Sequence, residues 1–435
     1  MGTPFRMEED LAERLFPPEP SEIEWGLDRT RALLAELGDP QRSAPVLHVG
    51  GTNGKGSVAA LAASVLQAHG LKVGLYTSPH LLSLRERFRV DGAPVRDQVL
   101  LSEAEDARPL FEAAGASHFE AATVLAFQVF RRMEVEVCVV EVGLGGRLDA
   151  TNVVEPVGVV VTNVDLDHRE YLGNTLEEVA LEKAGILKAG VPAVVGEPRP
   201  ALRRIFRRVA EERGAILHLV EPDRELLQVE CEWDGTAIGA ETAPWGKVSL
   251  RSPLVGLHQP GNLLLALRAL ERLPVSIRPT RTALGEGFSQ VVLPGRLQVV
   301  DQGGVRWILD VAHNPAGARA LSRTLDALVP PRPVTLLAGV LGDKDWKSML
   351  RPLAERVDRV LLTDPPGASE ARRWDPQRAA RYLAPLVPTE VRPEFAEALR
   401  LAKEGGSGSV VVTGSSSVVG EALRRLAPSA KLSAP

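Results

Sequence analysis

The sequence predicts an α/β protein built on two mostly parallel sheets, each with helices on both faces. Short apolar runs of strand length alternate with amphipathic stretches of helix length, which is the pattern of βαβ units. This alternation occurs twice along the 435 residues, with a break between the two series. A length of about 150 residues per domain also favours two or three domains.

The first series predicts a larger N-terminal domain over residues 1–293. We expect its strands at 46–49, 73–76, 135–142, 157–164 and 193–196, and helices at 58–69 and 176–187. Late in this domain, at about 219–255, short alternating segments indicate a small β-rich insert instead of another βαβ unit.

The second series predicts a smaller C-terminal domain over residues 294–435. Pro294 and Gly295 interrupt the segment between the two series, and such residues are typical of a domain boundary. The expected strands of this domain are 307–311, 335–340, 360–363 and 409–413.

Composition excludes several classes of function. The net charge of −5 and the lack of a lysine- or arginine-rich run argue against nucleic-acid binding. No apolar run reaches the ~18 residues that a membrane helix needs. Two cysteines form no disulfide framework, and the first 20 residues lack the apolar core of a signal peptide. We therefore expect a cytoplasmic monomer that acts on small molecules.

Residues 46–61, VLHVGGTNGKGSVAAL, predict a phosphate site. A strand, a glycine loop and a helix direct backbone N–H groups at one point, and Lys55 adds a positive charge. The loop differs from the common G-x-x-x-x-G-K-[ST] pattern because Gly56 separates Lys55 from Ser57. A glycine-rich turn with a solvated lysine is the alternative. The expected ATP-binding residues of the loop are Thr52, Asn53, Gly54, Lys55, Gly56 and Ser57.

Polar clusters follow three further strands of the same predicted sheet. They are TSPH after residue 76, GLGGRLDATN after 142 and DLDH after 164. Ligands of open α/β sheets bind beyond the carboxyl ends of the strands, so four clusters at one edge indicate a composite site.

Eight motifs occur in order and carry a family resemblance. They are GTNGKGS after HV, YTSPHL, EVGLGGRLDATN, NVDLDH, LEKAGI, HQPGN, LPGR and LDVAHNP. Together they resemble the folylpolyglutamate synthase and dihydrofolate synthase branch of the Mur ligase superfamily, over roughly residues 20–420. The glycine loop alone indicates the superfamily, whereas TSPH and GLGGRLDATN point to the folate branch. The resemblance implies a P-loop-type N-terminal domain and a Rossmann-like C-terminal domain.

The resemblance also implies an ATP-dependent amide ligase. ATP phosphorylates a carboxylate, and the amine of L-glutamate displaces the phosphate. We expect dihydropteroate and reduced folates as acceptors, with both dihydrofolate synthase and folylpolyglutamate synthase activity. Folylpolyglutamate synthase activity alone, another Mur-type ligase such as a cell-wall precursor enzyme, and a P-loop nucleotide switch are the alternatives.

Phosphoryl transfer to a carboxylate calls for magnesium, an ion that prefers oxygen ligands. Ser57, Ser78 and Glu141 offer oxygens from three strand ends, and Glu141 interrupts an apolar run. A strand-edge carboxylate facing water is the alternative for Glu141. His168 follows two acids at a strand end, and the resemblance adds it to the metal or phosphate site. We expect two Mg²⁺ ions.

Lys183 lies on the apolar stripe of a predicted helix, with no acid three or four residues away. Burial there would lower the pKa of its amine. The resemblance implies that Lys183 is carbamylated and becomes an anionic metal ligand. A lysine that covers the helix end with its aliphatic stem is the alternative.

The remaining candidates come from the resemblance. It assigns Asn262 to the adenine, with a helix N-cap as the alternative, and Arg296 to phosphate, with a linker salt bridge as the alternative. Asp310 would contact nucleotide, and His313 the incoming glutamate. The glutamate carboxylate would bind at Ser415, Ser416 and Ser417, unless these residues only cap a helix. The pterin would contact Phe119, Thr123, Asp149 and Ala150, although Phe119 also suits a core position. The expected catalytic residues are Lys55, Lys183, His168, Arg296 and His313.

Overall fold

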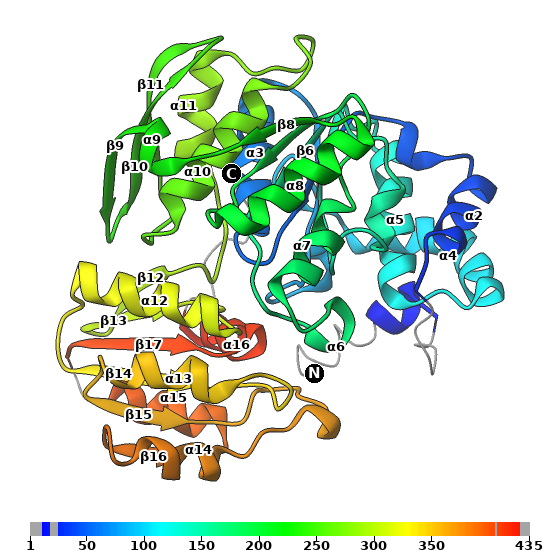
Figure 1. Ribbon diagram of the computed structural model, residues 1–435. Helices are drawn as coiled ribbons and strands as arrows, with labels where there is room; N and C mark the ends of the chain where they lie inside the picture. The colour runs from blue at the N-terminus through cyan, green and yellow to red at the C-terminus, as the bar shows by residue number, and fades with distance from the viewer. Residues whose placement is uncertain (1–10, 18–24, 405–406, 427–435) are drawn as a thin grey trace.

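The structure is a computed structural model that describes residues 11–17, 25–404 and 407–426. Two mostly parallel sheets, each flanked by helices, occupy separate regions of the molecule (Figure 1). The predicted α/β fold class is therefore confirmed. Within the described residues, no helix is long and apolar enough to cross a membrane.

The larger sheet has eight strands in the order β4-β3-β2-β5-β1-β6-β7-β8. Its six strands from β2 to β8 run parallel, whereas β3 and β4 form an antiparallel edge. The strands are β1 (Val46–Gly50), β2 (Val73–Tyr76), β3 (Phe88–Val90), β4 (Ala93–Pro94), β5 (Val137–Glu141), β6 (Gly158–Val161), β7 (Pro192–Val195) and β8 (Ile216–Leu219).

Helices cover both faces of this sheet because the central strands are apolar on both sides. Along β5, Val137 and Val139 pack with α3, α10 and α11, whereas Cys138 and Val140 pack with α2, α4 and α5. This alternation follows the two-residue period of a strand. The helices are α2 (Asp28–Glu36), α3 (Lys55–Ala68), α4 (Asp97–Ala114), α5 (His118–Arg132), α6 (Arg169–Leu172), α7 (Leu176–Ala184), α8 (Pro200–Arg213), α9 (Pro222–Glu225), α10 (Gln259–Glu271) and α11 (Arg281–Gln290).

An antiparallel three-stranded sheet lies within the segment predicted as a β-rich insert. Its strands are β9 (Leu226–Glu232), β10 (Gly235–Thr242) and β11 (Gly246–Ser252). One face joins the core that α10 and α11 share. At the turn between β9 and β10, the Trp233 Nε1 donates to the carbonyl oxygen of Leu328, 2.8 Å away, so the insert also touches the C-terminal part.

The third sheet has six strands in the order β12-β13-β17-β14-β15-β16, with β12 antiparallel to its neighbour. The strands are β12 (Gln298–Gln302), β13 (Val305–Leu309), β14 (Val334–Ala338), β15 (Arg359–Leu362), β16 (Thr389–Val391) and β17 (Ser409–Thr413). The helices are α12 (Pro315–Leu328), α13 (Trp346–Ala354), α14 (Pro376–Leu383), α15 (Phe395–Lys403) and α16 (Ser416–Leu426). The expected boundary at 293/294 falls between α11 and β12 and stays a prediction.

Several predicted strands extend too far along their apolar runs. The strand expected at 157–164 pairs only from Gly158 to Val161. The Thr162 N–H still donates to the Gly50 carbonyl of β1 at 2.9 Å, but beyond it the Val164 N–H donates to the Glu197 carboxylate instead of to a neighbouring strand. Likewise, the strand expected at 135–142 spans only Val137–Glu141. Apolar character continues where backbone pairing has already stopped.

Candidate active site

A cleft of about 520 Å³ lies at the carboxyl ends of the central strands of the larger sheet and is closed from the other side by the C-terminal part. All of the residues predicted for ATP, metal and catalysis line it. They are Thr52, Asn53, Gly54, Lys55, Gly56, Ser57, Ser78, Glu141, His168, Lys183, Asn262, Arg296, Asp310 and His313. The structure thus brings motifs from five strand ends, two helices and a linker to one place.

The glycine loop is held in place by the residues that follow β6. The backbone N–H of Thr52 donates to the carbonyl oxygen of Asn163 at 2.9 Å, and that of Asn53 donates to the Asn163 Oδ1 at 3.0 Å. The Thr162 hydroxyl donates to the Asn53 carbonyl at 2.7 Å. The loop then runs into α3, which begins at Lys55. Its shape is therefore fixed by the protein itself, as a phosphate cradle requires.

Gly54 is required by both backbone and space, and its replacement should weaken nucleotide binding. Its φ is +85°, and a Cβ there would lie 2.6 Å from the Asn262 Oδ1. We expect Gly54→Ala to lower the free energy of unfolding by about 2 kcal/mol and to raise the KM for ATP several-fold, because left-handed backbone strains a residue with a Cβ. Urea unfolding and initial rates measure the two effects.

Gly261→Ala is the matched control for stability. Gly261 lies inside α10, and no atom beyond its own helix backbone lies within 4 Å of the position that a Cβ would take. Gly261 is the third residue of α10, and within a helix alanine is up to about 1 kcal/mol more favourable than glycine. Gly261→Ala should therefore stabilise the protein, and an equal loss from both replacements would contradict the role given to Gly54.

Lys55, Glu141 and Arg296 surround the start of α3. Glu141, at the end of β5, is 4% exposed, and burial raises the pKa of its carboxyl against the opposing charges of Lys55 and Arg296. A Cβ on Gly56 would lie 3.7 Å from the Glu141 Oε2 and 4.0 Å from the Arg296 Nη2. Gly56, the residue that distinguishes this loop from the common one, therefore lies beside Glu141 and Arg296, although a Cβ there would make only ordinary van der Waals contacts.

The potential metal-ligand atoms around Glu141 suit magnesium better than zinc. Among the described residues, no three His, Cys, Asp or Glu side chains cluster as a metal site. The Ser78 N–H donates to the Glu141 Oε2 at 3.3 Å, so Ser78 lies beside that carboxylate. One buried carboxylate with hydroxyls of Ser57 and Ser78 nearby offers only oxygen, which fits an ion that keeps several waters and shares phosphate oxygens.

Lys183 is buried beneath the glycine loop. Its side chain donates from Nζ to the carbonyl oxygen of Gly51 at 2.8 Å, and the residue is 3% exposed. Burial, assisted by the charge of Lys55, lowers the pKa of Lys183 to about 7. A large share of this amine is therefore neutral near neutral pH, and the side chain does not extend to solvent at the helix end.

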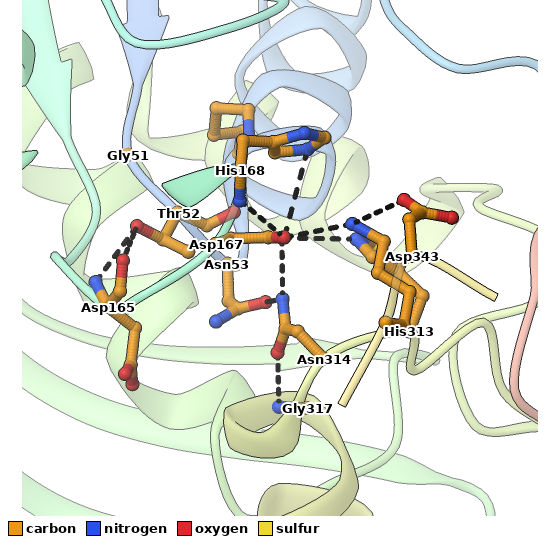
Figure 2. A network of polar contacts seen from close by, with 12 residues as sticks. Gly51, Thr52, Asn53, Asp165, Asp167, His168, His313, Asn314, Gly317 and Asp343 are labelled. Carbon is orange, nitrogen blue, oxygen red and sulfur yellow. Dashed lines mark hydrogen bonds and ion pairs between the residues drawn. The ribbon is translucent and has the colours of Figure 1, made fainter. Parts of the chain in front are cut away.

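A network centred on Asp167 joins the two sides of the cleft (Figure 2). The Lys344 Nζ lies 2.9 Å from its Oδ1, the Asn314 Nδ2 lies 3.0 Å from its Oδ2, and the His313 Nε2 lies 3.6 Å from Oδ2. Burial raises the pKa of Asp167, but His313, Lys344 and His168 outweigh burial and hold the pKa below its ordinary value. Asp167 thus contacts three residues of the C-terminal part and accepts hydrogen bonds from two of them, Asn314 and Lys344.

Asn314 extends this network to the glycine loop. Its Nδ2 also donates to the Asn53 Oδ1 at 3.0 Å, while its Oδ1 accepts from the Gly317 N–H at 2.8 Å and caps α12. His168, next to Asp167, adopts a φ of 49°, and burial lowers the pKa of its imidazole to about 4. Asp167, Asn314 and Lys344 were not predicted as site residues. Two of them lie inside quoted motifs, whereas Lys344 has no motif signal.

Asn262 and Arg296 lack the structural roles that were their alternatives. Helix α10 begins at Gln259, so Asn262 lies within the helix and is not its N-cap. Its Nδ2 donates to the Gln259 Oε1 at 2.9 Å. Arg296 makes no ion pair with any carboxylate among the residues that the structure describes. The alternative role of Arg296, a salt bridge in the linker, is therefore not formed by these residues. Both side chains are left facing the cleft.

Asp310 connects the linker to the loop that carries His313. Its Oδ2 accepts from the Leu297 N–H and its Oδ1 from the Ala312 N–H, both at 2.9 Å. Burial raises the pKa of its carboxyl, with the charge of Arg296 opposing the rise. The His313 Nδ1 contacts the Val311 carbonyl at 3.0 Å and therefore carries a proton, which leaves Nε2 toward Asp167.

The residues predicted for glutamate at the start of α16 do not line the cleft. Ser415 is 2% exposed, and its Oγ accepts from the Val418 N–H at 3.3 Å, as a capping residue does. The preceding Gly414 N–H donates to the Ala312 carbonyl at 3.2 Å. Ser415, Ser416 and Ser417 therefore lie next to the His313 loop but outside the cleft lining.

The four residues predicted for the pterin also lie outside the cleft lining. The Thr123 hydroxyl donates to the Phe119 carbonyl at 2.8 Å, and the Phe119 ring packs against Gly143. Asp149 and Ala150 are 4% and 5% exposed. Their part in substrate binding stays a prediction, because in this structure they contact other residues of the protein and do not line the cleft.

Asp149 shapes the loop that follows β5. Its Oδ2 accepts from the Leu144 N–H at 2.7 Å, and its Oδ1 accepts from the Thr151 N–H at 3.0 Å and from the Thr151 hydroxyl. The Thr151 hydroxyl lies 2.9 Å from the Nε2 of His48, a fully buried residue of β1. A chain of polar contacts thus runs from the strand before the glycine loop to the cleft-lining Leu144.

Comparisons with known proteins agree with this geometry. Residues 49–270 match the Mur ligase middle domain, and residues 295–416 match the Mur ligase, glutamate ligase domain. The fold and the cleft thus define an ATP-dependent ligase that forms amide bonds. The chain belongs to the folylpolyglutamate synthase/dihydrofolate synthase family.

Individual relatives match over nearly the whole chain. A dihydrofolate synthase/folylpolyglutamate synthase of Bacillus subtilis is 32% identical over 413 residues, which cover 92% of this chain and 95% of the relative. The Mycobacterium tuberculosis folylpolyglutamate synthase complexed with ADP superposes with a TM-score of 0.86 at 31% identity, covering 98% of each chain. The E. coli FolC in complex with DHPP and ADP gives 0.81 at 33% identity, also over 98% of each chain.

Proposed function

We propose that this protein adds L-glutamate both to dihydropteroate and to folylpolyglutamates, with ATP as the energy source. The observation that carries the proposal is the shared cleft, in which the glycine loop and Glu141 of the larger sheet face Asp310 and His313 of the third sheet. Relatives named for both activities support the bifunctional form. The structure of the E. coli relative with DHPP and ADP supports these two kinds of ligand.

The chemistry has two steps. A carboxylate oxygen of the folate substrate attacks the γ-phosphorus of ATP, and ADP leaves. The amine of glutamate then attacks the acyl carbon, inorganic phosphate leaves, and the ammonium proton is lost. Lys55 and Arg296 neutralise charge on the transferring phosphoryl group. His313, with Nδ1 occupied by Val311, presents Nε2 to orient or deprotonate the amine.

Two Mg²⁺ ions complete the proposed site. Ser57, Ser78 and Glu141 would hold one, and His168 with a carbamylated Lys183 would hold the other. When bound, magnesium neutralises phosphate charge during transfer. The lowered pKa of Lys183 supports carbamylation, because only a neutral amine adds to CO₂, forming an N–C bond and releasing one proton. The proposed active form is a monomer, since all of these residues come from one chain.

Labelled glutamate tests the proposal. Purified protein receives ATP, magnesium and labelled L-glutamate, with dihydropteroate in one reaction and tetrahydrofolate in another. We expect incorporation into both acceptors. Incorporation into tetrahydrofolate alone would reduce the function to folylpolyglutamate synthase. ATP hydrolysis without incorporation into either acceptor would overturn the ligase and favour a nucleotide switch.

A further inference from the structure

The loop of residues 79–86, which we call the Glu86 loop, is held rigid by one buried carboxylate. The Oε2 of Glu86 accepts from the Leu81 N–H at 2.9 Å, and its Oε1 accepts from the N–H groups of Leu82 at 3.0 Å and Ser83 at 2.9 Å. Glu86 is 6% exposed. Hydrogen bonds to an ionised acceptor are stronger than neutral ones, and few waters compete for this carboxylate. The loop is therefore a fixed surface.

Helix α16 of the C-terminal part rests on this surface. A Cβ at Gly420 would clash with the carbonyl oxygen of Leu81, so the helix approaches the loop as closely as glycine permits. Four residues further along α16, the Arg424 Nη2 donates to the Leu82 carbonyl at 2.6 Å. The side chains of Leu81 and Leu82 also pack against the apolar core formed by β13, β17 and α16.

The two sides of this contact lead to the two halves of the proposed reaction. On one side, Ser78 directly precedes the loop and donates its N–H to Glu141 beside the glycine loop. On the other side, α16 follows Gly414, which donates to the Ala312 carbonyl next to His313. The contact between the Glu86 loop and α16 thus connects the phosphate side of the cleft, at Glu141, with the proposed glutamate side, at His313.

We infer that Arg424 and the Glu86 loop are positioning groups for the addition of glutamate to the acyl phosphate. The inference rests on the proposed function. Amide formation needs the amine about 3–3.5 Å from the acyl carbon, and a misplacement of about 1 Å slows such a step roughly 10²-fold. Phosphorylation of the folate carboxylate takes place on the other side of the contact. Loosening α16 should therefore impair the second step and spare the first.

Two adjacent arginines provide a matched pair of variants. Arg424 and Arg425 both pair with Glu421, at 3.4 and 2.7 Å, but only Arg424 reaches the Glu86 loop. We expect Arg424→Ala to lower kcat/KM for glutamate at least tenfold, with the KM for ATP within twofold of wild type. More ATP should be consumed per glutamate incorporated, because the waiting acyl phosphate hydrolyses. Arg425→Ala should behave as wild type, and Arg424→Lys should recover part of the loss.

Glu86→Gln changes the other partner of the same contact, the Glu86 loop. It replaces one acceptor oxygen by an NH₂ group. Like Arg424→Ala, it should therefore lower kcat/KM for glutamate and leave the KM for ATP nearly unchanged. Combined with Arg424→Ala, it should add little, since both changes act through one contact. If Glu86→Gln fails to fold by circular dichroism, the two arginine variants decide alone.

Four outcomes test this inference, and the last of them distinguishes its failure from failure of the proposed function. Equal losses in Arg424→Ala and Arg425→Ala, or a loss confined to the KM for ATP, would overturn the positioning role. Tight coupling of ATP use to incorporation in Arg424→Ala would overturn it as well. Absence of incorporation by the wild-type protein would instead overturn the proposed function.

Discussion

Lys55→Ala should lower kcat about 10³-fold, which is the typical cost of removing one electrostatic stabiliser of a transition state. Lys55 begins α3, lines the cleft, and lies within 3.1 Å of the Thr52 carbonyl through its Nζ. Its replacement removes a positive charge from the glycine loop, where the transferred phosphate is proposed to bind. Initial rates of glutamate incorporation at saturating ATP measure the effect.

Lys247→Ala is the control for a change of charge alone. Lys247 is an exposed residue of β11 and is not among the residues that line the cleft. It should retain wild-type rates and stability. A Lys55→Ala variant that turns over at the wild-type rate would show that the glycine loop does not bind the transferred phosphate.

Lys183→Met should lower the activity at least 10²-fold and yet raise the free energy of unfolding. Activity falls because the proposed metal-holding carbamate cannot form. Stability rises because burial of Lys183 lowers its pKa to about 7 from 10.5, which opposes folding whenever the unfolded chain holds that proton. We expect a gain of about 2 kcal/mol at pH 7, less than the shift alone implies, since the hydrogen bond to Gly51 is lost.

The gain should depend on pH in a defined direction. Below about pH 7 the folded and unfolded proteins both hold the proton, so the cost of burying Lys183 is complete. Between pH 7 and 10.5 only the unfolded chain holds it, and wild-type stability rises relative to the variant. Urea unfolding in CO₂-free buffer at pH 7 and 9.5 should show the difference shrinking. A difference that does not change with pH would contradict the lowered pKa, and Lys247→Met supplies the baseline.

The fold was largely predictable because apolar runs mark buried parallel strands well. Errors lie where another requirement competes with strand pairing, as at Val164, whose N–H donates to the Glu197 carboxylate instead of to a neighbouring strand. The antiparallel edge strands β3 and β4 were missed altogether. They hold three and two residues, too few for a period of two to be visible.

The site was predictable where residues follow strand ends within motifs, and less so where the fold brings distant segments together. Asp167 and Lys344 are 177 residues apart in sequence, and their ion pair depends on how two sheets face each other. Likewise, no spacing in the sequence shows that Arg424 reaches the Leu82 carbonyl. Motifs identify the chemistry that each strand end offers, but contacts between parts of the chain arise from tertiary packing.

The anchoring of Asp149 affects how substrate-binding experiments must be interpreted. Both oxygens of its carboxylate already accept hydrogen bonds from Leu144 and Thr151. An Asp149→Ala variant would therefore release a wall of the cleft even if the aspartate never touches a ligand. Weakened folate binding in that variant does not demonstrate direct contact. Thr151→Val, which removes a hydroxyl from the same loop and leaves the carboxylate available, separates a lost contact from a loosened wall.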